Sequence, residues 1–68
     1  MKYQPVKSSN LAAIGYQNGT MGIRFLNGSE YHYPEVSAEQ CAAIRNAESV
    51  GAAFNQFKRS HPYAGVKQ

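Results

Sequence analysis

The residue types that most often carry out catalysis are sparse in this 68-residue sequence. It contains no aspartate, its four acidic residues are scattered glutamates, and its two histidines, His32 and His61, lie far apart. Cys41 and His32 could act as a nucleophile and its base, but Cys41 is predicted on the buried face of a helix, where a thiol is usually inert. A single cysteine also cannot build a cysteine-based zinc site. We therefore predict a protein that is not an enzyme and that carries no metal and no cofactor.

Cations and small polar residues point instead to the binding of an anion. The formal net charge is +3, and no acidic residue follows Glu48, so the last part of the chain is basic. A basic surface of this kind suits a nucleic acid or a nucleotide. The candidate binding residues are Arg24, His32, Lys58, Arg59, His61, Ser8, Ser9 and Asn10.

Several of these candidates also have a structural explanation. Arg24 can pair with Glu30 across two strands, and such a surface pair contributes roughly 0–1 kcal/mol. Lys58 and Arg59 are cations of the kind that a helix dipole favours at a helix C-terminus. The Ser-Ser-Asn sequence at 8–10 is typical of a turn. The sequence leaves both explanations open for these residues.

The elements that must position these residues begin with two β-hairpins. Asn-Gly pairs at 18–19 and 27–28 predict two tight turns, and apolar residues alternate with other residues beside them. The predicted strands cover residues 11–17, 20–26 and 29–33. They form a three-stranded antiparallel meander. Residues 1–7 are predicted to be a flexible arm, because Pro5 interrupts regular strand pairing.

The register of the hairpins decides which side chains face the core. In the first hairpin, the predicted pairs are Tyr16 with Met21, Ile14 with Ile23, and Ala12 with Phe25. In the second hairpin, a two-residue loop would bury Glu30 among apolar side chains, which is costly. We therefore predict a three-residue loop with a left-handed Gly28, which turns Tyr31 and Tyr33 toward the core.

The outer face of the sheet follows from the same register. It is predicted to carry Leu11, Ala13, Gly15, Gly22, Arg24, Leu26, Glu30 and His32. Gly15 and Gly22 face one another, which leaves bare backbone that a ligand or another backbone segment can approach closely. This gap favours a binding site beside Arg24.

Two short helices are predicted after the sheet. Ser37 and Gln40 form a capping box at the start of the first helix. Ser49 caps a second helix, in which apolar residues recur at helical spacing. The predicted helix ends are Ala47 for the first helix and Phe57 or Arg59 for the second. Residues 64–68 are predicted to be a tail.

The expected fold is one α+β domain over residues 1–68. A three-stranded antiparallel meander is followed by two short helices, which pack on one sheet face. A chain of this length buries only about 60% of its unfolded surface, so the core is small. It cannot also enclose a deep catalytic cavity, which again favours a binding module.

Four short segments match a known family in the right order. They are the run from Ser8 to Tyr16, the Phe-x-Asn-Gly-x-x-Tyr-x-Tyr pattern at 25–33, the Ala-x-Ser-x-Gly-x-x-Phe-Asn pattern at 47–55, and Pro62-Tyr63. On these residues the sequence resembles the KTSC domain family across 6–66. The family is named for a domain at the C-terminus of some lysyl-tRNA synthetases, and it also includes free-standing small bacterial and phage proteins. The resemblance implies RNA as a partner.

Composition limits where the protein acts. The sequence has no apolar run long enough for a transmembrane helix, and no apolar segment follows Lys2 as it would in a secretory signal. A lone cysteine suits the reducing cytoplasm. We predict a cytoplasmic module that binds RNA rather than DNA through its basic surface. Two alternatives stay open: an oligomeric phage-type protein that sequesters a small nucleotide signal, and a protein–protein interaction module, or homo-oligomer, that pairs through an exposed sheet face or edge.

Overall fold

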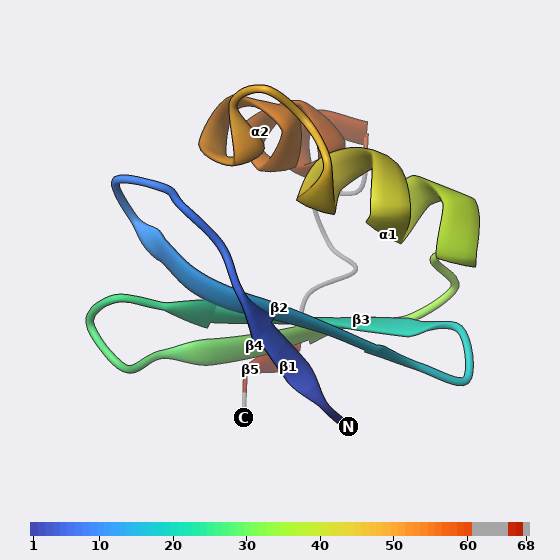
Figure 1. Ribbon diagram of the computed structural model, residues 1–68. Coiled ribbons are helices and arrows are strands. Elements are labelled where there is room, and N and C mark those ends of the chain that lie inside the picture. Colours follow the sequence, from blue (N-terminus) through green and yellow to red (C-terminus); the bar gives the residue numbers. More distant parts are fainter. Residues whose placement is uncertain (61–65, 68) are drawn as a thin grey trace.

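The computed structural model describes residues 1–60 and 66–67, which form an antiparallel sheet and two helices (Figure 1). The elements are β1 (Tyr3–Pro5), β2 (Leu11–Gln17), β3 (Thr20–Phe25), β4 (Glu30–Tyr33), α1 (Ala38–Arg45), α2 (Val50–Ser60) and β5 (Val66–Lys67). The strands lie in the order β1-β2-β3-β4-β5, and both helices cover the same sheet face (Figure 1). The predicted α+β class and the central meander are confirmed, but the three-strand prediction is incomplete, because β1 and β5 extend the sheet at its two edges.

The two hairpins have the predicted turns. Asn18 and Gly19 have φ angles of 51° and 79°, which a two-residue hairpin turn requires. Gly28 has a φ of 94°, the left-handed conformation expected for the longer second loop. The predicted register of the second hairpin is confirmed by the pairs Met21–Tyr33, Gly22–His32, Ile23–Tyr31 and Arg24–Glu30. Both tyrosines of β4 therefore face the core.

The first hairpin departs from the prediction near the start of β2. Tyr16 pairs with Met21 and Ile14 with Ile23 as predicted, but the predicted pair of Ala12 with Phe25 is wrong. Leu11 takes the place opposite Phe25, and Ala13 pairs with Arg24, so one extra residue of β2 forms a bulge. A bulge changes the face on which the preceding side chain lies. Leu11, which was predicted on the outer face, is therefore fully buried in the core.

The core lies between the sheet and the two helices. The capping box of α1 is present: the Gln40 backbone N–H donates to Ser37 Oγ at 3.1 Å, and the Ser37 N–H donates to Gln40 Oε1 at 3.0 Å. Phe54 of α2 is fully buried, and its ring lies 5.7 Å from that of Tyr33. The buried cluster consists of Leu11, Ile14, Met21, Ile23, Tyr33, Val36, Cys41, Ile44, Val50, Phe54 and Phe57. Neither described helix is long and apolar enough to cross a membrane.

Part of the arm predicted over residues 1–7 forms a strand. Tyr3, Gln4 and Pro5 form β1, which pairs with β2 at the edge of the sheet. Proline is tolerated there because an edge strand has one side that needs no backbone donor. At the opposite edge, part of the predicted tail 64–68 forms β5, which pairs with β4. Residues 64, 65 and 68 lie outside the described residues.

Candidate nucleic-acid interface

The glycine gap on the outer sheet face is filled by the N-terminal residues of the chain. Gly15 and Gly22 are paired neighbours on β2 and β3, and both are buried. A Cβ atom on Gly22 would collide with the Tyr3 hydroxyl and would lie 2.6 Å from Met1 Sδ. A Cβ atom on Gly15 would lie 2.9 Å from the Lys2 carbonyl oxygen. Of the two predicted explanations for the bare backbone, a ligand or another segment of backbone, the structure has the second, because residues 1–3 occupy the gap.

Tyr3 reaches across β2 and β3 to a polar cluster on β4. Its hydroxyl donates to Glu30 Oε2 at 2.9 Å and lies 3.1 Å from His32 Nε2. The His32 Nε2 atom also lies 3.0 Å from Glu30 Oε2. Arg24 bonds Glu30 Oε1 through Nη2 at 3.2 Å, and its guanidinium carbon lies 4.2 Å from the centre of the Tyr3 ring. The structure thus brings Arg24 and His32 together. Their interactions in the described part of the chain, however, are with Glu30 and Tyr3.

The hydrogen bonds of this cluster favour the ionised form of Glu30. The bond from Tyr3, followed by those from His32 and Arg24, holds the pKa of Glu30 below its ordinary value of 4.5. Partial burial and the bond to the Glu30 carboxylate raise the pKa of Tyr3 to about 12. The cluster is therefore a neutral phenol that donates to a carboxylate over the whole physiological pH range.

Acid is expected to weaken the fold through Glu30. Because the folded-state pKa is lowered, the stabilising contribution of this carboxylate is complete above its unfolded pKa and is lost as the pH falls through the folded value. The free energy of unfolding, measured by urea titration at a series of acidic pH values, should fall less steeply for Glu30→Gln than for the parent. Glu48→Gln, at an exposed site, is the matched control. Identical acid profiles for the parent and Glu30→Gln would contradict the expectation.

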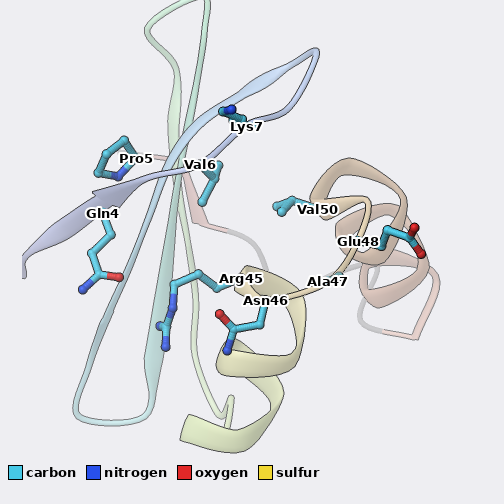
Figure 2. A pocket seen from close by; sticks show the side chains of 9 residues that line it. All are labelled: Gln4, Pro5, Val6, Lys7, Arg45, Asn46, Ala47, Glu48 and Val50. Carbon is cyan, nitrogen blue, oxygen red and sulfur yellow. The ribbon is translucent and has the colours of Figure 1, made fainter.

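A groove of about 380 Å³ lies on the other side of β1, between this strand and the turn that joins the two helices (Figure 2). One wall is formed by residues 4–7 and the other by the end of α1 and the residues that follow it. Figure 2 shows the side chains of Gln4 and Arg45 directed into the space between the strand and α1. The lining residues are Gln4, Pro5, Val6, Lys7, Arg45, Asn46, Ala47, Glu48 and Val50.

Two cations of this groove have no anionic partner within the described part of the chain. The ion pairs found there join Arg24 and His32 to Glu30, so Lys7 and Arg45 remain unpaired. Glu48 also lines the groove, but its side chain points away from β1 (Figure 2). Unpaired cations beside the amides of two neutral side chains can bind an anion through charge and hydrogen bonds together.

Comparison with known proteins identifies the family. The model of the KTSC domain family matches residues 7–63, which is most of the chain. The chain belongs to the KTSC domain family. An uncharacterized protein from Stutzerimonas stutzeri (strain A1501) is 36% identical to this KTSC domain over 64 residues, which cover 90% of each chain.

The Ser8–Asn10 segment of this KTSC domain forms a turn that rests against α2. Ser8 Oγ accepts from the backbone N–H groups of Asn10 and Leu11, each at 3.3 Å, and donates to Asn10 Oδ1 at 3.0 Å. A Cβ atom on Gly51 of α2 would lie 3.1 Å from Ser8 Oγ. The Ser8 hydroxyl and the side-chain oxygen of Asn10 are thus used within the turn, while Ser9 is exposed.

The remaining candidate cations of the KTSC domain lie at the far end of α2. Lys58 and Arg59 are exposed on its last turn, and Lys58 Nζ lies 5.3 Å from the centre of the Phe54 ring. The helix dipole and this ring contact both stabilise cations at this position. His61 lies outside the described residues. Arg59 therefore sits away from the groove, which borders the first residue of α2, Val50.

The structure separates the two residues considered as a nucleophile and base. Cys41 lies in the core on α1, where burial raises the pKa of its thiol. His32 lies on the outer face of β4, bonded to Glu30. The residues described by the structure contain no group of three or more histidine, cysteine or acidic side chains that could hold a metal ion. The structure instead brings Lys7 and Arg45 to one groove. This groove exists because β1 joins the sheet, which was not predicted.

Proposed function

We propose that this KTSC domain is a non-catalytic cytoplasmic module that binds single-stranded RNA through its phosphate backbone. The observation that carries the proposal is that Lys7 and Arg45, neither of which is in an ion pair among the described residues, line one groove. The two cations come from separate elements, so the fold itself creates the local positive charge. Phosphate contacts of this kind dominate the affinity of proteins for nucleic acids.

The size and lining of the groove favour a flexible strand over a duplex. A volume of about 380 Å³ lies at the low end of the roughly 300–1,000 Å³ of ligand pockets, and it suits a short stretch of single strand. The amides of Gln4 and Asn46 can donate and accept hydrogen bonds with base edges or ribose hydroxyls. The occurrence of the family at the C-terminus of some lysyl-tRNA synthetases favours RNA over DNA.

Removing both groove cations is expected to weaken RNA binding strongly. Each phosphate contact to a single strand contributes a slope of about −0.7 to the dependence of log affinity on log salt concentration. Two contacts therefore raise the affinity at 0.1 M salt by about 25-fold, relative to 1 M salt. Lys7→Ala/Arg45→Ala should lose about this factor and flatten the slope by about 1.4. The measurement is fluorescence anisotropy of a labelled single-stranded RNA across a salt series.

A matched control removes the same charge elsewhere. Lys58→Ala/Arg59→Ala also loses two cations, both exposed at the far end of α2. The proposal expects a smaller loss of affinity from this pair than from the groove pair. If the α2 pair causes the larger loss, the main contact lies on the helix end. If the parent shows no saturable binding of RNA at low salt, the RNA proposal is wrong.

A small free nucleotide is a second candidate ligand, because the groove is a bounded hollow with both charge and amide groups. Competition of labelled RNA by mono-, di- and cyclic nucleotides distinguishes the two. Light scattering on the same samples reports the oligomer that nucleotide sequestration predicts. Tight binding of a free nucleotide by a stable oligomer would replace the RNA proposal.

A further inference from the structure

β1 connects the groove to the polar cluster on the outer sheet face. Side chains of a strand alternate between the two faces of a sheet. Tyr3 pairs with Gly15 and points to the outer face, whereas Gln4 pairs with Ile14 and lines the groove on the helix side. The strand that carries one wall of the groove is thus anchored from the opposite face by its own tyrosine.

We infer that Tyr3 is a positioning residue for the groove: its ring fills the slot over Gly22, and this contact holds Gln4 and Lys7 in their wall of the groove. The binding part of this inference rests on the proposed function, whereas the placement of β1 does not. Its side chain bonds or packs on Glu30, His32, Arg24 and Gly22, none of which lines the groove, so it acts through the position of its strand.

The backbone of β1 alone gives weak attachment. The strand has three residues, lies at the sheet edge, and includes Pro5, which has no N–H to donate. The next backbone bond runs from the Val6 N–H to the Ala12 carbonyl at 3.1 Å. So few backbone bonds hold a short edge strand weakly, and side-chain contacts must supply much of the attachment.

Tyr3 supplies such contacts on two other strands, β3 and β4. The hydroxyl end of its ring lies against Gly22 of β3, and its hydroxyl bonds Glu30 on β4. Arg24 of β3 covers the ring with its guanidinium group, in the geometry of a cation–π contact. Because Gly22 lacks a side chain, the ring can approach the backbone there in a way that no other residue type at this position would allow.

Gly22 offers a test that leaves the groove residues unchanged. An alanine at this position would collide with the Tyr3 hydroxyl, and its other near contact is the flexible end of Met1. Gly22→Ala should therefore expel the Tyr3 ring from the slot. In a chain that already carries Tyr3→Ala, there is no ring to expel, so the second substitution should add little. The two substitutions are expected to be strongly coupled in a double-mutant cycle.

The experiment compares the parent, Gly22→Ala, Tyr3→Ala, the double variant and Tyr3→Phe at a temperature where all are folded. Hydrogen exchange of the Val6 amide reports attachment of β1, and it should be about tenfold faster in both single variants. RNA affinity at 0.1 M salt should fall about fivefold, and the salt slope should flatten by about 0.7, as expected for one lost phosphate contact. Tyr3→Phe keeps the ring and loses only the hydroxyl bonds, so it should change both readouts in the same direction by less.

The outcomes separate the two proposals. Unchanged Val6 exchange in Gly22→Ala, or additive effects of Gly22→Ala and Tyr3→Ala, would overturn the positioning role of Tyr3. Lower affinity with an unchanged salt slope would also overturn it, because general destabilisation does not remove one particular phosphate contact. Faster, coupled Val6 exchange in a parent that binds no RNA would support the positioning role and would reject the RNA proposal alone. If Gly22→Ala fails to fold, the same readouts in Tyr3→Phe and Tyr3→Ala decide the inference.

Discussion

Replacing Phe54 by alanine is expected to lower the free energy of unfolding by about 3–5 kcal/mol, the usual cost of removing a buried aromatic ring. Phe54 is fully buried, and it joins α2 to the sheet. Its ring lies 5.7 Å from that of Tyr33 on β4 and 5.9 Å from that of Phe25 on β3. A domain of this size has only about 5–15 kcal/mol of stability in total, so the variant should be near the limit of folding.

Urea denaturation and thermal melting measure this loss, with Asn55→Ala as the control. Asn55 is the next residue of the same helix and is exposed, so its replacement should change stability by no more than about 0.5 kcal/mol. In a small domain, each 1 kcal/mol shifts the melting temperature by about 4–8 °C. A Phe54→Ala protein that melts within a few degrees of the parent would contradict the packing of α2 on the sheet.

Local signals explain why the centre of the fold was predictable. The Asn-Gly turn at 18–19 and the left-handed Gly28 are set by backbone sterics that act within a few residues. Two registers of the second hairpin were possible, and one was predicted because the other would bury the Glu30 carboxylate at a cost in free energy. The structure has the predicted register, with Glu30 on the outer face. The capping box of Ser37 and Gln40 is equally local.

The edge strands depend on contacts that leave no local pattern. A three-residue strand such as β1 is too short for a period-two pattern, and Pro5 argued against pairing. The facing glycines, Gly15 and Gly22, did indicate a close approach of another group. The sequence alone could not tell that this group was the chain's own residues 1–3, because the choice between a ligand and a distant segment is made by tertiary structure.

The candidate site was harder to predict for the same reason. Cations that are neighbours along the chain, such as Lys58 and Arg59, are visible in the sequence as a basic run. Lys7 and Arg45 are far apart in sequence and meet across the groove only because β1 joins the sheet. The sequence offered only half a signal: Lys7 has no acidic residue near it in the chain, but Glu48 follows Arg45 at the i, i+3 spacing that pairs side chains on a helix.

The bulge in β2 is a further feature that sequence reasoning missed, and it separates two leucines that were both predicted on the outer face. A regular register places Leu11 and Leu26 outside, but one extra residue in β2 turns Leu11 inward. Leu11 is fully buried, whereas Leu26 is 62% exposed. The two residues have the same chemistry and opposite surroundings, so they form a matched pair.

Leu11→Ala is therefore expected to lower the free energy of unfolding by about 2–5 kcal/mol, because it removes buried methyl groups and leaves a cavity. Leu26→Ala should change it by no more than about 0.5 kcal/mol, because its side chain is already in contact with water. Urea titration of both variants beside the parent measures the difference. Equal, small losses would mean that Leu11 lies on the outer face and that β2 pairs with β3 without a bulge. A large loss for Leu11→Ala alone requires the bulged register, since only that register carries this side chain under the helices.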